Sequence, residues 1–439
     1  MRKAFLGLAC LALLFSGEVS FATQSARSSL GPAAVFTTDP GDIWLFPAEL
    51  NSYPRLLSLE LDSFPFDRNR MSFWGTWSDD EQKLGTVGIG FGDLTNQKGF
   101  EGLIASLNYA ISNHPLMSPR NNIPLPGNKF HLFYARDMGL LVAGLHIARA
   151  SGDKSYDFNN TIPADSVKRR AHSGIWSFDV GASRIFGDNI YLQTGLGFQA
   201  ISYSSEFELS GADPLYWEKV ESREGSGKKL DARLFYGMTP AIKIVPALSF
   251  NSFTLGYTAS YADTMHMPGS MYDKTGGKYS QSGFAAYLGT EYCPKPGVKL
   301  LAGLSLEGSG IEISDSNNIW LVSAIPSQKY ISREVGTIVL PGLQAGIEAD
   351  LLKWLTLRLG ASQKTSWINS KTRFASAAAA TTEEASSESD FNICFGLGFN
   401  FGQLTIDAQL NEDQPYNMGY LLSGNPDAPF AKISLKYSY

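Results

Sequence analysis

Alternation of apolar and polar residues with a period of two is the dominant pattern of this chain. It is clearest in the last ten residues, where lysines and serines alternate with Ala431, Ile433, Leu435, Tyr437 and Tyr439. Neighbouring side chains of a β-strand point to opposite faces. The segment therefore predicts a strand with one apolar face and one polar face.

The same alternation recurs as pairs of strands joined by tight turns. In the clearest pair, residues 391–401 and 404–410 both alternate, and only Gly402 and Gln403 separate them. A short connection that contains glycine is a typical hairpin turn. Further hairpins are predicted at residues 176–198, 284–306 and 343–361. Long polar connections, predicted as loops, follow at 111–127, 151–172, 204–229, 262–282, 309–335, 366–389 and 412–428.

The lengths of these strands and connections favour a membrane barrel over a water-soluble β-sandwich. Many strands reach the roughly 9–11 residues that a tilted strand needs to cross a bilayer. Short and long connections alternate, as in outer-membrane barrels. We therefore predict an all-β fold, a transmembrane antiparallel β-barrel of about fourteen strands at residues 51–439. Fourteen strands are counted from Leu103 onward. The alternative is sixteen, in which three earlier candidates, at 57–61, 71–78 and 87–91, supply two more wall strands and plug rather than an irregular entry region.

The polar faces of the strands are predicted to line the lumen of this barrel. They carry many glycines and the charged residues Asp179, Glu307, Glu348 and Arg358. Glu348 and Arg358 lie on the same side of neighbouring predicted strands, where they can form a cross-strand ion pair. A structural role for this pair is favoured over contact with a substrate.

Aromatic residues near predicted strand ends indicate girdles at the two membrane interfaces. Membrane barrels place aromatic side chains where lipid meets water. The alternative explanation is the general preference of aromatic residues for strands. The candidates are Tyr257, Tyr261, Trp354, Phe399, Phe401, Tyr437 and Tyr439.

The first 22 residues have the pattern of a cleaved secretory signal. Arg2 and Lys3 precede an apolar stretch at residues 5–15, and Ser20-Phe21-Ala22 gives a small–x–small cleavage pattern. No later stretch has the ~18 apolar residues of a transmembrane helix. Export of a barrel predicts the bacterial outer membrane as the location and its lipid bilayer as a partner. The formal net charge of −6 gives no reason to expect nucleic acid.

Residues 23–50 lack the strand alternation and contain several glycines and prolines. Within them, residues 39–50 read Asp-Pro-Gly-Asp-Ile-Trp-Leu-Phe-Pro-Ala-Glu-Leu. An apolar segment stiffened by proline is expected to pack into the mouth of the barrel rather than remain in water. We expect it to form a hatch or plug, with Trp44, Phe46, Pro47 and Ala48 as its lumen and ligand contacts.

Residues 39–50 resemble the Asn-Pro-Ala segment near the start of the FadL-type long-chain fatty acid transporter family. Phe46 stands in place of the asparagine and Glu49 in place of a glycine. The resemblance implies a fourteen-stranded barrel with an N-terminal hatch that moves hydrophobic molecules across the outer membrane. It also implies that the barrel-assembly machinery reads the aromatic-ended last strand. The matching positions are Asp39, Ile43, Trp44, Pro47, Ala48 and Leu50.

No group of residues in the sequence points firmly to catalysis or to a cofactor. Met265-His266-Met267 offers sulfur and imidazole ligands that suit copper, although an ordinary loop is favoured. His172 and Ser173 are neighbours in a predicted strand, so their side chains point to opposite faces and cannot pair as base and nucleophile. Cys293 and Cys394 lie far apart in sequence, and whether they form a disulfide stays open.

The sequence thus predicts passive uptake of small hydrophobic molecules through a plugged outer-membrane barrel without enzymatic activity. Two alternatives stay open. One is a non-transporting barrel that anchors or shuttles secreted proteins, and the other is an open general porin. The sequence predicts neither the identity of the ligand nor the oligomeric state.

Overall fold

The computed structural model describes most of the chain outside its first residues and several connections. The described residues are 24–63, 69–79, 83–92, 124, 126–159, 166–210, 216–263, 272–316, 329–375, 381–410 and 430–439. The predicted signal at residues 1–22 and the Met265-His266-Met267 segment lie outside these ranges.

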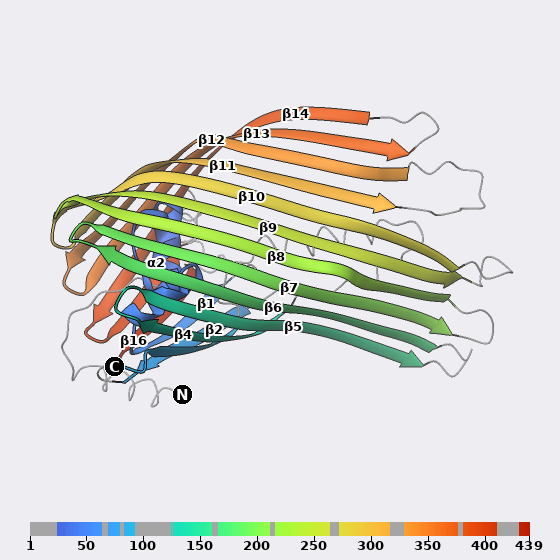
Figure 1. The fold of residues 1–439 in the computed structure, drawn as a ribbon, viewed down its shortest axis with the longest axis horizontal. Helices are drawn as coiled ribbons and strands as arrows, with labels where there is room; N and C mark the ends of the chain where they lie inside the picture. The colour runs from blue at the N-terminus through green and yellow to red at the C-terminus, as the bar shows by residue number, and fades with distance from the viewer. Residues whose placement is uncertain are drawn as a thin grey trace, which may run out of the picture.

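Sixteen antiparallel strands close into one barrel within the described ranges (Figure 1). Each strand pairs with its neighbours in sequence, and β16 pairs with β1 to complete the ring. The predicted all-β barrel is confirmed. The strands are β1 (Leu56–Ser63), β2 (Asn69–Ser78), β3 (Thr86–Gly92), β4 (Asn128–Asp137), β5 (Val142–Asn159), β6 (Ser166–Phe186), β7 (Ile190–Ser210), β8 (Tyr216–Thr239), β9 (Ile242–Asp263), β10 (Tyr272–Lys295), β11 (Val298–Ser316), β12 (Lys329–Leu352), β13 (Leu355–Ala375), β14 (Thr381–Phe401), β15 (Leu404–Leu410) and β16 (Phe430–Ser438).

The described barrel has sixteen strands, which is the alternative prediction, and the leading prediction of fourteen was wrong. The three early candidates form β1, β2 and β3, and all three pair into the wall instead of serving as an entry region. The last strand closes the barrel against the first, with Tyr437 opposite Leu57 and Lys432 opposite Asp62. Closure gives every edge strand a partner, which a sheet in lipid requires.

The wall is much taller on one side than on the other (Figure 1). Strands β5–β14 have 18 to 24 residues, whereas β4 has 10 and β15 has 7. Much of the predicted loops at 151–172, 204–229 and 366–389 is therefore strand. In the last of these stretches the apolar alternation is lost because both faces of the strand are exposed, as residues 381–391 of β14 show.

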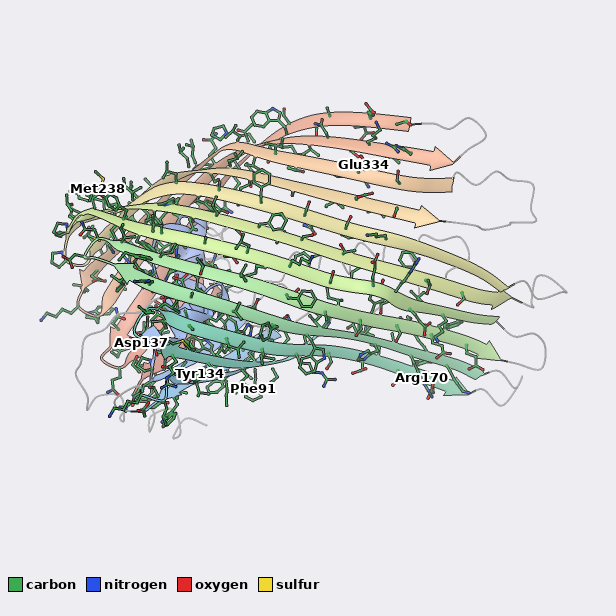
Figure 2. The ribbon with its side chains drawn as sticks, in the orientation of Figure 1. Phe91, Tyr134, Asp137, Arg170, Met238 and Glu334 are labelled. Carbon is green, nitrogen blue, oxygen red and sulfur yellow. The ribbon has the colours of Figure 1, made fainter. Side chains whose placement is uncertain are left out.

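An apolar belt surrounds the outside of the barrel near its short turns. In β6 it runs from Trp176 to Phe186, and in β14 from Phe391 to Phe401. These spans match the roughly 9–11 residues that cross a bilayer. In Figure 2, Phe91, Tyr134 and Met238 lie at the end of the molecule with the short turns, whereas Arg170 and Glu334 lie on the far halves of the tall strands. An apolar outer band around a polar interior is the pattern of a membrane barrel.

The aromatic girdle is found at the short-turn end for most of its candidates. Trp354, Phe401, Tyr437 and Tyr439 are exposed on the outer face, and Phe399 stacks on Trp354 with 6.3 Å between ring centroids. The side chain of Tyr261 lies outside the described part. Tyr257 was predicted wrongly, because its side chain is only 7% exposed and points into the lumen. The apolar stripe of β9 above the belt faces inward rather than toward lipid.

Short helices at the start of the chain lie inside the barrel (Figure 1). They are α2 (Gln24–Ser29) and the 3-10 helices η2 (Gly31–Phe36), η3 (Pro40–Trp44) and η4 (Pro47–Ser52). Proline is the first residue of η3 and η4 and the second residue of η2, where its missing N–H costs no hydrogen bond. Among the residues described, no helix combines the length and apolar character needed to cross a membrane.

The position of the belt can be tested by placing a charge at two heights on one strand. Leu196 lies on the outer face of β7 within the belt, and Ser204 lies on the same face beyond it. We expect Leu196→Arg to destabilise the barrel by roughly 2–4 kcal/mol, because the guanidinium would enter hydrocarbon. Ser204→Arg should cost less than about 0.5 kcal/mol, as at an ordinary surface position. Denaturant unfolding from lipid vesicles measures both, and equal costs would contradict this placement of the belt.

Candidate functional site

Residues 24–52, called the lumen segment below, pack against the inner face of the wall on several sides. Helix η4 contacts β4, β5 and β6, whereas η2 contacts β11, β12 and β13. Helix α2 lies against β13–β16, near the closing strand. Most apolar side chains of the segment are buried, Ile43 and Leu50 completely. The segment therefore occupies the lumen at the height of the short strands.

A row of glycines on the inner face of the wall makes room for the backbone of the lumen segment. Gly144, Gly181 and Gly195 are cross-strand neighbours in β5, β6 and β7. A Cβ atom built on Gly195 would overlap the carbonyl oxygen of Leu45, and one built on Gly144 would overlap the backbone of Pro47. Any larger residue in this row would force the lumen segment away from the wall.

The four residues predicted as hatch contacts all belong to this packing. Trp44 and Phe46 are 7% and 3% exposed, and both lie against wall side chains. The ring of Pro47 rests on Gly181, and Ala48 is buried beside Gly144. The structure thus brings the four together on the side of the lumen segment that faces β5–β7.

Trp44 sits in an aromatic box formed by the wall. Its indole ring is edge-on to Phe133, His131 and His146, with centroid distances of 4.7, 5.0 and 5.7 Å. Trp74 of β2 closes another side at 6.3 Å. Edge-to-face contacts of this kind add to the area burial of a large aromatic side chain. Trp44 is therefore a main apolar anchor of the lumen segment.

The two histidines of the box are held by a buried hydrogen-bonded chain. Nδ1 of His146 lies 2.7 Å from Oδ2 of Asp179, and Nε2 of His146 lies 3.0 Å from Nδ1 of His131. A neutral His146 that donates to the carboxylate must accept from His131, which fixes both ring orientations. Sequence reasoning placed Asp179 in the lumen but assigned no role to His131 and His146. Their signal was a polar side chain on the lumen face of each of two neighbouring strands.

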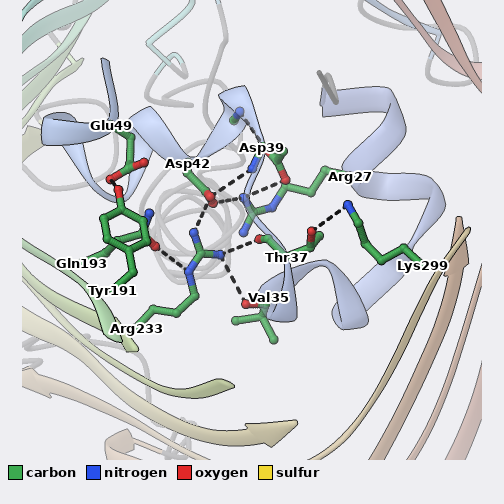
Figure 3. Close-up of polar contacts among 11 residues, drawn as sticks. Arg27, Val35, Thr37, Asp39, Asp42, Glu49, Tyr191, Gln193, Arg233 and Lys299 are labelled. Carbon is green, nitrogen blue, oxygen red and sulfur yellow. Dashed lines mark hydrogen bonds and ion pairs between the residues drawn. The ribbon is translucent and has the colours of Figure 1, made fainter. Parts of the chain in front are cut away.

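A buried arginine joins the lumen segment to wall strand β8 (Figure 3). The guanidinium of Arg233 donates to the carboxylate of Asp42, to the Thr37 carbonyl at 2.9 Å and to the Val35 carbonyl at 3.2 Å. Its Nε donates to Gln193 of β7 at 2.7 Å. Arg233 and Asp42 are both almost fully buried. Such a charge pair resists separation because either partner alone would remain uncompensated in a dry site.

Arg27 of α2 completes the ion network from within the lumen segment. Its Nη1 donates to Oδ1 of Asp42 at 2.6 Å and to Oδ2 of Asp39 at 3.4 Å. Asp39 also caps η3, because its side chain accepts from the backbone N–H of Gly41 at 2.7 Å. Asp42 is thus shared between one arginine of the segment and one of the wall, Arg233.

The two aspartates of this network differ in their affinity for protons. Burial raises the pKa of Asp39 to about 6, although the Arg27 charge opposes this effect. Burial also favours a raised pKa for Asp42, but the charges of Arg233 and Arg27 outweigh it and hold this pKa below its ordinary value. Asp42 therefore stays ionised at neutral pH, while Asp39 exchanges a proton near pH 6.

Further polar contacts fix the lumen segment around its perimeter. Nζ of Lys229 donates to the Trp44 carbonyl at 2.9 Å, and Nζ of Lys299 donates to the Thr37 hydroxyl at 3.1 Å. The hydroxyl of Tyr191 donates to the carboxylate of Glu49. These contacts come from β8, β11 and β7 respectively, so the segment is held from several directions.

The four charged residues predicted for the lumen all have partners there. Glu348 and Arg358 form the predicted ion pair, with 2.7 Å between Oε2 and Nε, and Arg358 also contacts Asp407 at 2.6 Å. Glu307 pairs with Lys364 at 2.8 Å. Asp179 belongs to the histidine chain. These charges therefore sit in three different parts of the lumen and form no single site.

An apolar patch lines the lumen above the lumen segment, on the inner face of the tall strands. It begins at the height of Trp176, whose side chain points outward while that of Ile175 points inward. We call it the upper lumen patch. Its buried members are Ala150, Ile175, Ile201, Tyr203, Val220, Leu255, Tyr257 and Tyr279, and Phe253, Ile311 and Ile313 pack against them.

A polar vestibule lies on the other side of the lumen segment, toward the short turns. It has a volume of about 750 Å³. The segment contributes Asp39, Glu49 and Tyr53 to its lining, and the wall contributes Lys299 and Arg358 among others. The lumen is therefore apolar above the segment and charged below it.

No metal centre or disulfide is found in the described part of the chain. No group of three potential ligands there is arranged to hold a metal ion. Cys293 and Cys394 form no disulfide with each other. His172 contacts Asp153 at 2.7 Å on the exposed face, whereas Ser173 is buried and donates to the Pro124 carbonyl. His172 and Ser173 therefore do not pair, as predicted.

Comparison with known proteins gives matches only among solved structures. No protein-family model and no curated protein matches the sequence. The toluene transporter TodX of Pseudomonas putida is similar at 11% identity, covering 95% of this chain and 96% of that one with a TM-score of 0.37. A Pseudomonas aeruginosa FadL homologue is similar at 10% identity, covering 97% and 99%, with a TM-score of 0.35. The ferric-catecholate import receptor Fiu of E. coli K12 is similar at 8% identity, covering 88% of this chain and 82% of that one, with a TM-score of 0.35.

A toluene transporter and a FadL homologue are thus among the structures that this chain resembles. TM-scores below 0.5 carry no inference about function. The function proposed below therefore rests on the residues of this chain.

The close approach between wall and lumen segment can be tested at one glycine. Gly195→Ala should weaken docking of the lumen segment by about 1–3 kcal/mol, because the new methyl group meets the Leu45 carbonyl. Gly336→Ala is the matched control, since a Cβ atom there meets nothing within 4 Å. Hydrogen exchange of residues 24–52 measures docking, and heat-dependent electrophoretic mobility reports whether the barrel is folded. Unchanged protection in the Gly195 variant would contradict the packing.

Docking of the lumen segment should also depend on pH through Asp39. Its pKa is raised from 3.8 to about 6 in the docked state, so docking takes up a proton and becomes stronger as pH falls from about 6 toward 4. The pKa of Asp42 is lowered, so its contribution is lost only when pH falls further. Hydrogen exchange of residues 24–52, corrected for the intrinsic pH dependence of exchange, should therefore show maximal protection near pH 4–5.

Asp39→Asn is the control for this pH effect. Asparagine keeps the cap of η3 but carries no titrating proton. The variant should lose most of the increase in protection between pH 6 and pH 4. Burial raises the pKa of Glu49 as well, so a smaller increase should remain. An undiminished pH dependence in Asp39→Asn would show that another group binds the proton.

Proposed function

We propose that this chain is an outer-membrane barrel for the passive uptake of small hydrophobic molecules. In this proposal residues 1–22 are a cleaved signal, residues 23–50 are the hatch, and residues 51–439 form the barrel. The apolar outer belt supports insertion in a bilayer, and the lumen segment supports a controlled rather than an open passage. The aromatic-ended β16, which closes the ring, is the element we propose for recognition by the assembly machinery.

The upper lumen patch is the observation that carries the proposal. Water-filled porin lumens are polar. Here side chains from seven consecutive strands, β5–β11, form one buried apolar cluster on the lumen side of the wall. A molecule with apolar surface that packs against this cluster would gain roughly 25 cal/mol per Å² buried.

The lumen segment is the element that we propose to control passage below the patch. Pro47 and Ala48 fill the space beside β5 and β6, Trp44 lies in its aromatic box, and the Asp42–Arg233 pair ties the segment to the nearby strand β8. A filled lumen at this height argues against an open general porin. A ligand on the upper lumen patch would reach the polar vestibule only when part of the segment moves.

The proposal can be tested by charging the upper lumen patch. Leu255→Glu places an unpaired carboxylate among buried apolar side chains and should lower the uptake of an apolar dye into liposomes roughly tenfold or more. Thr254→Glu is the matched control, because this preceding residue of the same strand faces outward, away from the lumen, and its substitution should leave uptake unchanged. Equal uptake by wild type and Leu255→Glu would contradict the proposed route.

A deletion tests the hatch separately. Removing residues 24–52 should raise the permeability of the liposomes to small sugars, because the lumen at that height would then be filled with water. Liposome swelling measures this permeability. If the deletion changes neither sugar permeability nor dye uptake, the barrel does not transport and the anchoring alternative gains support.

A further inference from the structure

A separate small cavity lies inside the lumen, between the lumen segment and wall strands β8–β10. Its volume is about 280 Å³. An apolar cavity of roughly 150 Å³ already accepts benzene, so this one has room for a molecule with a single ring. Most of its lining is apolar, including Pro32, Ala34, Leu45, Phe46, Ala247 and Tyr287.

The cavity exists because the lumen segment leaves the wall after the glycine row. The row of inward positions that begins with Gly144, Gly181 and Gly195 continues in register as Asp231 of β8 and Ser249 of β9. The backbone of residues 45–48 rests on the glycines. Beyond them, side chains of the wall and of the segment enclose a space instead.

Two charged wall residues line this space. Arg233 donates hydrogen bonds from all three of its nitrogens, and its guanidinium lies between the rings of Phe46 and Phe235 at 5.1 and 4.9 Å. Four of its five N–H groups thus have partners within the protein. Asp231 is 5% exposed, yet its Oδ2 accepts no hydrogen bond from any described residue.

The nearest cation does not satisfy this oxygen. Nζ of Lys229 is 3.7 Å from Oδ2 of Asp231, which exceeds hydrogen-bonding distance, and it donates instead to the Trp44 carbonyl at 2.9 Å. A buried carboxylate oxygen without a donor is unusual and costly. The cavity therefore offers a carboxylate oxygen that has no donor among the described residues, although the side chains of Arg27 and Ser249 also line the space.

We propose that this cavity binds a small apolar molecule that carries one hydroxyl or amine hydrogen-bond donor. The donor contacts the carboxylate of Asp231, which turns to present its unused oxygen, and the apolar body replaces water against Phe46, Leu45 and Ala247. The negative charge of Asp231 disfavours carboxylates, because a second anion would enter the same enclosed space. This inference rests on the proposed uptake function, to which it adds the chemical class of the transported molecule.

Three probes of similar size test the site on the purified full-length barrel in detergent. They are benzyl alcohol, toluene and benzoate, and isothermal titration with a protein-free micelle control measures their binding. Benzyl alcohol should bind roughly 10- to 100-fold more tightly than toluene, the range for a hydrogen bond to a charged acceptor. Benzoate should bind more weakly than either. Equal affinities for benzyl alcohol and toluene would overturn the proposal.

Variants locate the binding in this cavity. Asp231→Leu should reduce the affinity for benzyl alcohol to that for toluene, and Ala247→Phe should abolish both by filling the space. Glu307→Gln, which removes a lumen carboxylate outside the cavity, should change neither. Asp231→Asn, with nearly the same shape, should also reduce the preference for benzyl alcohol over toluene. It replaces the leucine variant in the experiment if that variant does not fold. A preference for benzyl alcohol that survives both Asp231 variants would refute the assignment.

The outcome of this experiment is separable from that of the uptake assays. Binding with the predicted preference, but without flux, would leave the site standing and remove the transport function. Flux without the preference would leave transport standing and remove the site. Heats that do not saturate with any probe would mean that the cavity holds water alone, and would also remove the site.

Discussion

The need to pair every backbone N–H and C=O group in a lipid environment is the constraint on which this structure depends. Closure of β16 on β1 meets it at the belt, where sixteen short crossings suffice. A ring of that size encloses more space than its own side chains fill. The lumen segment occupies that space. The regular wall pairs the backbone groups, and the irregular start of the chain fills the interior that the wall encloses.

Inside the ring, polar contacts and apolar contacts have different tasks. Trp44 and its aromatic box bury apolar surface, and the free energy gained by this burial depends little on the orientation of the groups. The Asp42–Arg233 pair adds direction, because a buried pair tolerates few alternative positions. Ion pairs of this kind add little net stability over an apolar substitute, but they specify one docked arrangement. A segment held in this way can leave and return to the same place.

Sequence patterning predicted the wall well and its interior only in part. Period-two alternation works where one face meets lipid and the other meets water, which is why the hairpin at 391–410 was placed correctly. It fails beyond the belt, where residues 381–391 are exposed throughout and read as a loop. It also assigned Tyr257 to the wrong side, since an apolar stripe looks the same whether it faces lipid or a lumen ligand. Asp231 and Arg233 escaped notice because their roles depend on contacts with residues far away in sequence.

The unequal height of the strands has a consequence for the surface beyond the membrane. β15 ends at Leu410, so the upper part of β14 has a described neighbour only on its β13 side. This part of β14 carries Glu383, Glu384, Glu388 and Asp390, all exposed, and Glu383 pairs with Lys371 of β13. Charged side chains on a strand disfavour the addition of a further strand by another chain. Two copies that approached along this strand would bring like charges together, which opposes their joining into a continuous sheet.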